Sequence, residues 1–239
     1  MSYDSNQNPY QAPAFDIAAR AGVSERGKFI INTYAHLIGA ILALVGLEAI
    51  LLSTSLGNQM LGMIMGNRFA WLIIIGMFIG VSYIAETWAR SNTSKGMQYM
   101  GLGLYVAAES IILLPLLTLA MIKNPSLIAS AAWATIIITA LLSITVFITR
   151  KDFSFLRGIL VFGSFAVLGL IVLSIFTSFS LGPIFIYAVI ALSCGYILYQ
   201  TSNIMLHYRT DQHVAASLAL FASVALLFYY ILMLFMSRE

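Results

Sequence analysis

Residues 158–177 read GILVFGSFAVLGLIVLSIFT, a stretch without a charged residue that directly follows Arg157. An α-helix needs about 20 apolar residues to cross the hydrocarbon core of a bilayer. The rest of the chain contains six more runs of this kind. The 239 residues are 61% hydrophobic and 9% charged, with a mean hydropathy of +0.94. Soluble domains carry roughly a quarter charged residues. The composition therefore predicts an all-α membrane protein, a seven-transmembrane-helix bundle.

Helices are predicted because the apolar runs show no strand alternation and are too long for barrel strands. The connections are short, so neighbouring spans are expected to be antiparallel. Residues 29–237 form one predicted transmembrane domain, and residues 58–67 are expected at the membrane interface. The predicted spans are residues 29–53, 69–89, 99–122, 126–149, 157–177, 181–206 and 214–236.

The basic residues are distributed unequally between the two sides of the predicted bundle. Because Lys and Arg concentrate in cytoplasmic loops, the richer side is predicted to be cytoplasmic. That side contains the N-terminus. With seven spans Glu239 lies outside, whereas one re-entrant run would return it to the cytoplasm. The richer side holds Arg20, Arg26, Lys28, Arg90, Lys95, Arg150, Lys151, Arg157 and Arg209, and the other side holds Arg68, Lys123 and Arg238.

Residues 1–28 are polar and are predicted to be a disordered cytoplasmic N-terminal tail. A cleavable signal peptide of the usual form is not expected, because the first apolar run begins only near Phe29. Cys194 is the only cysteine, which excludes an intrachain disulfide and a cysteine zinc site. We expect no metal and no cofactor. The isoelectric point near 9.0 comes from scattered loop residues, so nucleic acid is not an expected partner, whereas the lipid bilayer is.

Ionisable groups inside a span cost about 2.5 to 3.5 kcal/mol, so each one needs a reason. Glu109 lies mid-span, shortly before Pro115, which frees a backbone carbonyl one turn earlier. Two interpretations remain: a proton or cation site, or a protonated carboxyl bonded to a neighbouring helix. Glu48, late in its span, is expected to reach the outer interface. Glu86 and Arg90 have the spacing of a helix-end ion pair.

The span 181–206 is polar near its cytoplasmic end. Tyr196, Gln200 and Asn203 recur there at helical spacing, so their face is predicted to contact protein or water. Glu109, Tyr196 and Asn203 form a candidate intramembrane polar site, at a polar seam between the third, sixth and seventh spans. Small residues indicate where helices touch. The pair Gly76 and Gly80 in the second span, and Gly101 and Gly103 at the start of the third, are expected to mark close helix approach.

Four segments resemble, in the same order, parts of the Bax inhibitor-1 family. Residues 147–158, FITRKDFSFLRG, are similar to that family's Thr-Arg-Lys-Asp-x-Ser-Phe-Leu segment. The segments NPSLI (124–128) and ILYQTSNI (197–204) fit as well, and NTY (32–34) opens the first span as in the family's bacterial branch. The resemblance covers roughly residues 28 to 237 and implies a seven-helix fold with the last helix central.

The resemblance also carries functional expectations. The family includes calcium-leak and pH-sensing members, death-suppressing members in eukaryotes, and a bacterial member that restrains a membrane-anchored, ATP-dependent protease. Leak-type members place one aspartate in the sixth span and another in the seventh. Residue matching puts Gln200 and Ser223 at these sensor positions. Neither side chain titrates near neutral pH. The acidic sensor is therefore absent, and an amide–hydroxyl contact that locks the two helices is expected instead.

Two functions follow from these observations. The first is a regulator that binds another membrane protein, such as a membrane-anchored protease. The polar N-terminal tail would be accessible to such a partner. The second is a calcium or proton leak channel in which Glu109 replaces the aspartate pair. An enzyme is not expected: HExxH and GxSxG motifs are absent, and Asp152 and Asp211 fall in loops. Short loops and the resemblance to the bacterial branch favour a bacterial inner membrane.

Overall fold

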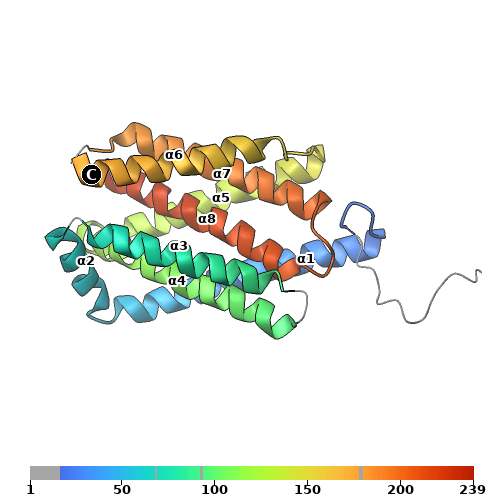
Figure 1. Ribbon diagram of the computed structural model, residues 1–239, viewed down its shortest axis with the longest axis horizontal. Helices are drawn as coiled ribbons and strands as arrows, with labels where there is room; N and C mark the ends of the chain where they lie inside the picture. Colours follow the sequence, from blue (N-terminus) through green and yellow to red (C-terminus); the bar gives the residue numbers. More distant parts are fainter. Residues whose placement is uncertain (1–16, 68, 92–93, 178–179) are drawn as a thin grey trace, which may run out of the picture.

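The computed structural model describes residues 17–67, 69–91, 94–177 and 180–239, and this part of the chain contains helices and no β-strand (Figure 1). An α-helix pairs the main-chain N–H and C=O groups of its interior within one segment, as lipid requires. The eight helices of the described part are α1 (Val23–Leu52), α2 (Leu56–Gly66), α3 (Ala70–Ala89), α4 (Lys95–Lys123), α5 (Ser126–Thr149), α6 (Leu156–Thr177), α7 (Pro183–Leu206) and α8 (His213–Met236).

Seven of these helices are long and apolar enough to cross a membrane, which confirms the predicted seven-span bundle. The exception is α2, the segment expected at the interface. It lies across the other helices at one end of the bundle (Figure 1). Gly57 and Met60 of α2 are buried, and Gly57 lies directly against Thr118 of α4. The first described residues and the C-terminus lie at opposite ends of the bundle. These are called the N-terminal end and the C-terminal end below.

Two helices begin earlier than hydropathy predicts. Helix α1 begins at Val23 rather than residue 29, and α4 begins at Lys95 rather than residue 99. Glu25 in the first turn of α1 favours the extension because a carboxylate interacts well with a helix N-terminus. In α4, the Ser94 hydroxyl accepts the Met97 N–H at 3.5 Å as an N-cap. Hydropathy marks the apolar part of a span, whereas these polar turns continue beyond it.

The segment just before α1 contacts the loop between α7 and α8. Ile17 forms an antiparallel bridge with Arg209, and the Ala18 N–H donates to the Tyr208 carbonyl oxygen at 2.8 Å. Ala18 is fully buried. Residues 17–28 therefore depart from the predicted disordered tail, because a backbone pairing and the first turns of α1 hold them in place. Residues 1–16 lie outside the described residues.

The last helix is central, as the resemblance implies. Helix α8 packs against α1, α3, α4, α5 and α7. Helix α4 is as enclosed as α8, with Leu113, Leu114 and Ala120 fully buried, which differs from the expectation of one central helix. The sequence does not distinguish an enclosed helix from one at the lipid surface, because the side of a membrane helix that faces lipid is as apolar as the side that faces protein.

The predicted close approach at Gly76 and Gly80 is wrong. A Cβ atom added at either position would meet nothing within 4 Å, so the GxxxG pair faces open space. Gly103 is equally open, whereas Gly101 lies against the backbone of α3. The close contact of α3 with α4 therefore depends on one glycine of the four.

Candidate functional site

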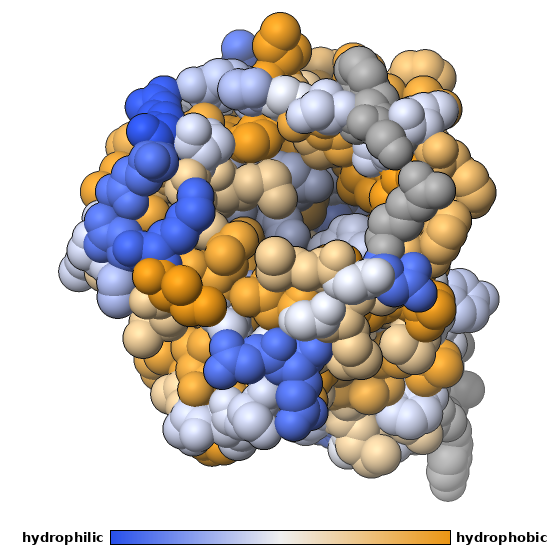
Figure 2. Space-filling model, turned by 90° about the vertical axis from the view of Figure 1, so that its left-hand side faces the viewer, coloured by the Kyte–Doolittle hydropathy of each residue, from blue (hydrophilic) through white to orange (hydrophobic). Residues whose placement is uncertain are grey.

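A cavity of about 850 Å³ lies between α3, α4, α6, α7 and α8. Figure 2 views the bundle from the C-terminal end and shows a hollow at its surface. Trp71, Phe185 and Met233 line the cavity near that end, whereas Glu86 and Gln200 line it near the N-terminal end. The cavity therefore follows most of the length of the bundle. Ligand cavities of this size are mostly apolar with a few placed polar groups, and this lining has that character.

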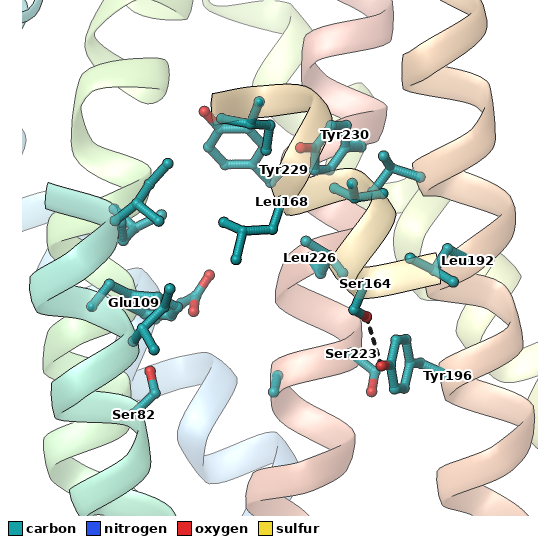
Figure 3. Close-up of a pocket in the computed structure, with 18 of the residues that line it drawn as sticks. Ser82, Glu109, Ser164, Leu168, Leu192, Tyr196, Ser223, Leu226, Tyr229 and Tyr230 are labelled. Carbon is teal, nitrogen blue, oxygen red and sulfur yellow. Dashed lines mark hydrogen bonds between the residues drawn. The ribbon is translucent and has the colours of Figure 1, made fainter. Parts of the chain in front are cut away.

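Glu109 projects from α4 into this cavity (Figure 3). Its residue surface is 5% exposed. Among the described residues, no hydrogen bond or ion pair reaches its carboxyl group, so the protonated acid bonded to a neighbouring helix is not what these residues form. The Ser82 hydroxyl from α3 lies on the same side of the cavity. Tyr105, one helical turn before Glu109, and Tyr229 of α8 are close enough to interact electrostatically with the carboxyl.

The two sensor positions both line the cavity, and so does Tyr196. The Ser223 hydroxyl donates to the Ala219 carbonyl oxygen at 3.0 Å, within its own helix. Among the described residues no hydrogen bond joins Ser223 to Gln200, so the expected lock between them is absent from this structure. Its absence has a physical reason: a serine in a helix satisfies its hydroxyl on the preceding turn without a partner helix.

The Tyr196 phenol forms a hydrogen bond of 2.7 Å with the Ser164 hydroxyl of α6 and donates to the Leu160 carbonyl oxygen at 3.2 Å. Asn203 is not among the lining residues. The main-chain carbonyl oxygen of Asn203 accepts the backbone N–H groups of His207 and Tyr208 at 2.8 and 3.0 Å, where α7 ends. The contribution of α6 to the cavity had no signal in the sequence beyond an isolated serine in an apolar run.

A charged cluster lies at the N-terminal end of the cavity. The ion pair expected between Glu86 and Arg90 is present, with 2.8 Å between Oε1 and Nη2. The Arg90 guanidinium also lies 6.0 Å from the centre of the Tyr208 ring. Burial raises the pKa of the Tyr208 phenol above its ordinary value. Because Ala18 pairs with the Tyr208 backbone, the residues before α1 and this cluster are joined.

Glu48 does not reach the interface as expected. Its residue surface is 5% exposed, and both carboxyl oxygens are buried without a hydrogen-bond partner within the described residues. It is not among the cavity-lining residues, although its charge interacts with that of Glu109. A position near the end of a span suggested water access, but the packing of α1 against α4 and α8 removes it.

Two segments that carry the family resemblance meet near the N-terminal end of the bundle. The Phe153 N–H donates to the Ser202 hydroxyl at 3.0 Å, which holds the α5–α6 loop against α7. In the same loop, Asp152 accepts hydrogen bonds from the Ser154 hydroxyl and N–H. These bonds, followed by a smaller effect of His207 at 3.5 Å, hold the pKa of Asp152 below its ordinary value.

No group of three or more histidine, cysteine, aspartate or glutamate side chains in the described ranges could hold a metal ion. The cavity therefore offers one free carboxyl, several hydroxyls and aromatic walls. This arrangement can attract a positive charge into the bundle, because a buried carboxylate without a partner gains from any cation that reaches it.

Comparisons with known proteins agree with this architecture. A family model described as "Inhibitor of apoptosis-promoting Bax1" matches residues 26–239. The Pseudomonas aeruginosa protein PA2604 is 32% identical over 207 residues, which cover 85% of this chain and 86% of that protein. Protein LIFEGUARD 4 of Arabidopsis thaliana is 29% identical over 148 residues, 60% of this chain and 59% of the relative. The chain therefore belongs to the Bax inhibitor-1 family of multi-pass membrane proteins.

Proposed function

We propose that this protein is a cation leak channel in which protons or calcium ions pass through the cavity and use Glu109 as their intramembrane charge. One observation carries the proposal: the Glu109 carboxyl lies free inside a cavity that follows most of the length of the bundle. Ionisable side chains inside a membrane bundle are rare, and ion pathways are among the functions they mark.

Glu109 suits this role better than the other acidic residue of the described lining. Glu86 is already paired with Arg90, so its charge is largely compensated. The family's sensor positions carry Gln200 and Ser223, which bring polarity to the cavity but no charge. Glu109 thus remains as the charge available to an entering cation.

Ion passage also requires a change at the N-terminal end of the cavity. Arg90 and Tyr208 lie beyond Glu86 at that end, and the backbone of Ala18 is bonded to Tyr208. A cation that has reached Glu86 meets the positive charge of Arg90. We therefore assign the gate to the Glu86–Arg90–Tyr208 cluster, whose movement would open the cavity to the second side of the membrane.

The proposed location is a bacterial inner membrane, which the short loops and the resemblance to the family's bacterial branch favour. The proposed orientation has a cytoplasmic N-terminus and rests on the distribution of Lys and Arg. In that orientation the hollow of Figure 2 faces the outside. The proposed role is transport rather than catalysis.

Reconstituted vesicles test the proposal. The purified protein is placed in vesicles loaded with a calcium dye or a pH dye, and flux is followed from about pH 5 to 8. Wild type and Glu25→Gln, which neutralises an exposed carboxylate at the start of α1, should leak equally. Glu109→Gln should leak no more than empty vesicles. Absence of any wild-type flux, or an unchanged flux in Glu109→Gln, contradicts the proposal.

The regulatory function stays a prediction. It depends on the polar N-terminal segment, most of which lies outside the described residues, and on the family resemblance. Crosslinking in native membranes tests it, since a bound protease or another membrane protein should be recovered with the chain. Repeated recovery of the chain alone would count against it.

A further inference from the structure

Aromatic rings make up much of the cavity wall. They come from α3, α4, α7 and α8, whereas α6 contributes serine and aliphatic side chains to the lining. Figure 3 shows the Tyr229 and Tyr230 rings on the opposite side of the cavity from Ser82. The face of an aromatic ring attracts a cation, and desolvation strengthens this attraction. The rings include those of Trp71, Phe78, Tyr105, Phe185, Tyr196 and Tyr229.

The carboxyl of Glu109 is an unpartnered acidic group of this cavity, and the Ser82 hydroxyl in the same lining is also without a hydrogen-bond partner in the described residues. Glu109 is 5% exposed, and its carboxyl points into the cavity. No described residue forms a hydrogen bond or ion pair with this carboxyl. Tyr105 lies one helical turn before Glu109 on α4, and the phenols of Tyr105 and Tyr229 are near enough for their charge to interact with that of the carboxyl. A cation placed beside the carboxyl would therefore contact aromatic surface at the same time.

The surroundings of Glu109 favour one kind of cation for stable binding. Calcium takes six to eight oxygen ligands in a close shell. The cavity lining, however, also contains many aliphatic side chains, among them Leu168, Leu226 and Ile112. Figure 3 shows Leu168 pointing at the space in front of the carboxyl. An inorganic ion can pass through this part of the cavity but binds weakly there, because it finds few oxygen ligands. A cation with apolar substituents binds more favourably, because its substituents contact the apolar and aromatic lining.

We propose that this cavity is a binding site for an organic cation, a quaternary ammonium with apolar substituents, whose charge lies at Glu109 and whose body contacts the aromatic walls. A volume of about 850 Å³ accommodates a molecule of drug-like size. This site goes beyond the proposed leak, because it requires a resident ligand rather than a passing ion. A bound organic cation would also block the cavity to inorganic cations.

Trp71 provides a direct measurement of binding. It lines the cavity, while Trp88 and Trp133 do not, so Trp88→Phe with Trp133→Phe leaves one reporter tryptophan. Benzyltrimethylammonium should change Trp71 fluorescence saturably in the purified protein. Neopentylbenzene, in which carbon replaces the charged nitrogen, is the matched neutral probe and should bind more weakly.

Glu109→Gln should weaken benzyltrimethylammonium binding by about tenfold or more and leave neopentylbenzene unaffected. Tyr105→Leu keeps Glu109 but removes a ring, and it should also weaken benzyltrimethylammonium binding selectively. This variant provides the test if Glu109→Gln fails to fold. A non-saturable response, equal affinity for both probes, or unchanged affinity in both variants would overturn the proposal. Saturable binding without any vesicle flux would support this site and contradict the leak, so the two outcomes are separable.

Discussion

The backbone of Gly101 in α4 lies directly against the carbonyl oxygen of Ala85 in α3. A Cβ atom at Gly101 would stand 2.5 Å from that oxygen and 2.6 Å from the backbone nitrogen of Ala89. Both neighbours are main-chain atoms, so they cannot rotate away as a flexible side chain can. The contact between α3 and α4 thus tolerates hydrogen at this position and no larger group.

Gly101→Ala should therefore destabilise the bundle although alanine favours helix formation. Forcing one methyl group into a packed contact costs about 1 to 3 kcal/mol. Gly80→Ala is the matched control, since the added Cβ there meets nothing within 4 Å. Thermal unfolding in detergent should show a lower midpoint for Gly101→Ala and an unchanged or slightly higher one for Gly80→Ala. Equal midpoints for the two variants would mean that α3 and α4 move apart to accommodate the methyl group without loss of stability.

The glycines illustrate what the sequence can and cannot predict. The seven spans follow from hydropathy, because lipid requires long apolar helices whatever their neighbours are. Which side of a helix touches protein depends on its rotation, and Gly80 and Gly101 carry no signal for rotation in an apolar run. The same limit explains why the enclosure of α4 was missed and why Glu48 was expected at the interface.

The candidate site was predictable in part. Glu109 is recognisable because a charge in the middle of a span needs a reason, and Gln200 and Tyr196 because they recur with Asn203 at helical spacing. The cavity is also lined by Ser164 of α6 and Tyr229 of α8. Serine and tyrosine are common in transmembrane helices, so these two residues gave no signal in the sequence. Their convergence comes from the tertiary packing of α6, α7 and α8, which no local pattern encodes.

Ala18 gives a second matched comparison. Its side chain is fully buried at the α7–α8 loop, whereas Ala19 is exposed. Ala18→Leu should overpack this contact and release the segment, while Ala19→Leu adds the same volume in solvent. Trypsin reports the release by cleavage after Arg20. We expect cleavage of Ala18→Leu to be about tenfold faster, because about 1.4 kcal/mol of lost contact raises the open population tenfold. Equal rates in the two variants would show that the segment is not held there.

Asp152 predicts a pH-dependent stability outside the membrane. Because hydrogen bonds from Ser154 lower its pKa in the folded protein, the ionised carboxylate stabilises the fold above the ordinary aspartate pKa of about 3.9. This contribution is lost as the pH falls through the lowered pKa. Asp152→Asn should therefore unfold at a lower temperature than wild type near neutral pH, and the difference should shrink in acid. Ser154→Ala should show the same dependence. A difference between Asp152→Asn and wild type that does not change with pH would contradict the assignment.

The sensor positions give the last prediction. Gln200 and Ser223 both line the cavity, from α7 and α8. The double variant Gln200→Asp with Ser223→Asp should restore an acidic pair, in which like charges at short range share a proton. Two ionised carboxylates repel, so the thermal stability of this variant should fall as the pH rises from about 5 to 8. Gln200→Asn with Ser223→Asn keeps the size and polarity but cannot ionise, and its stability should not change over that range. If both double variants respond identically to pH, the two positions are too far apart to interact, and the residue matching that assigned them to the family's sensor is wrong.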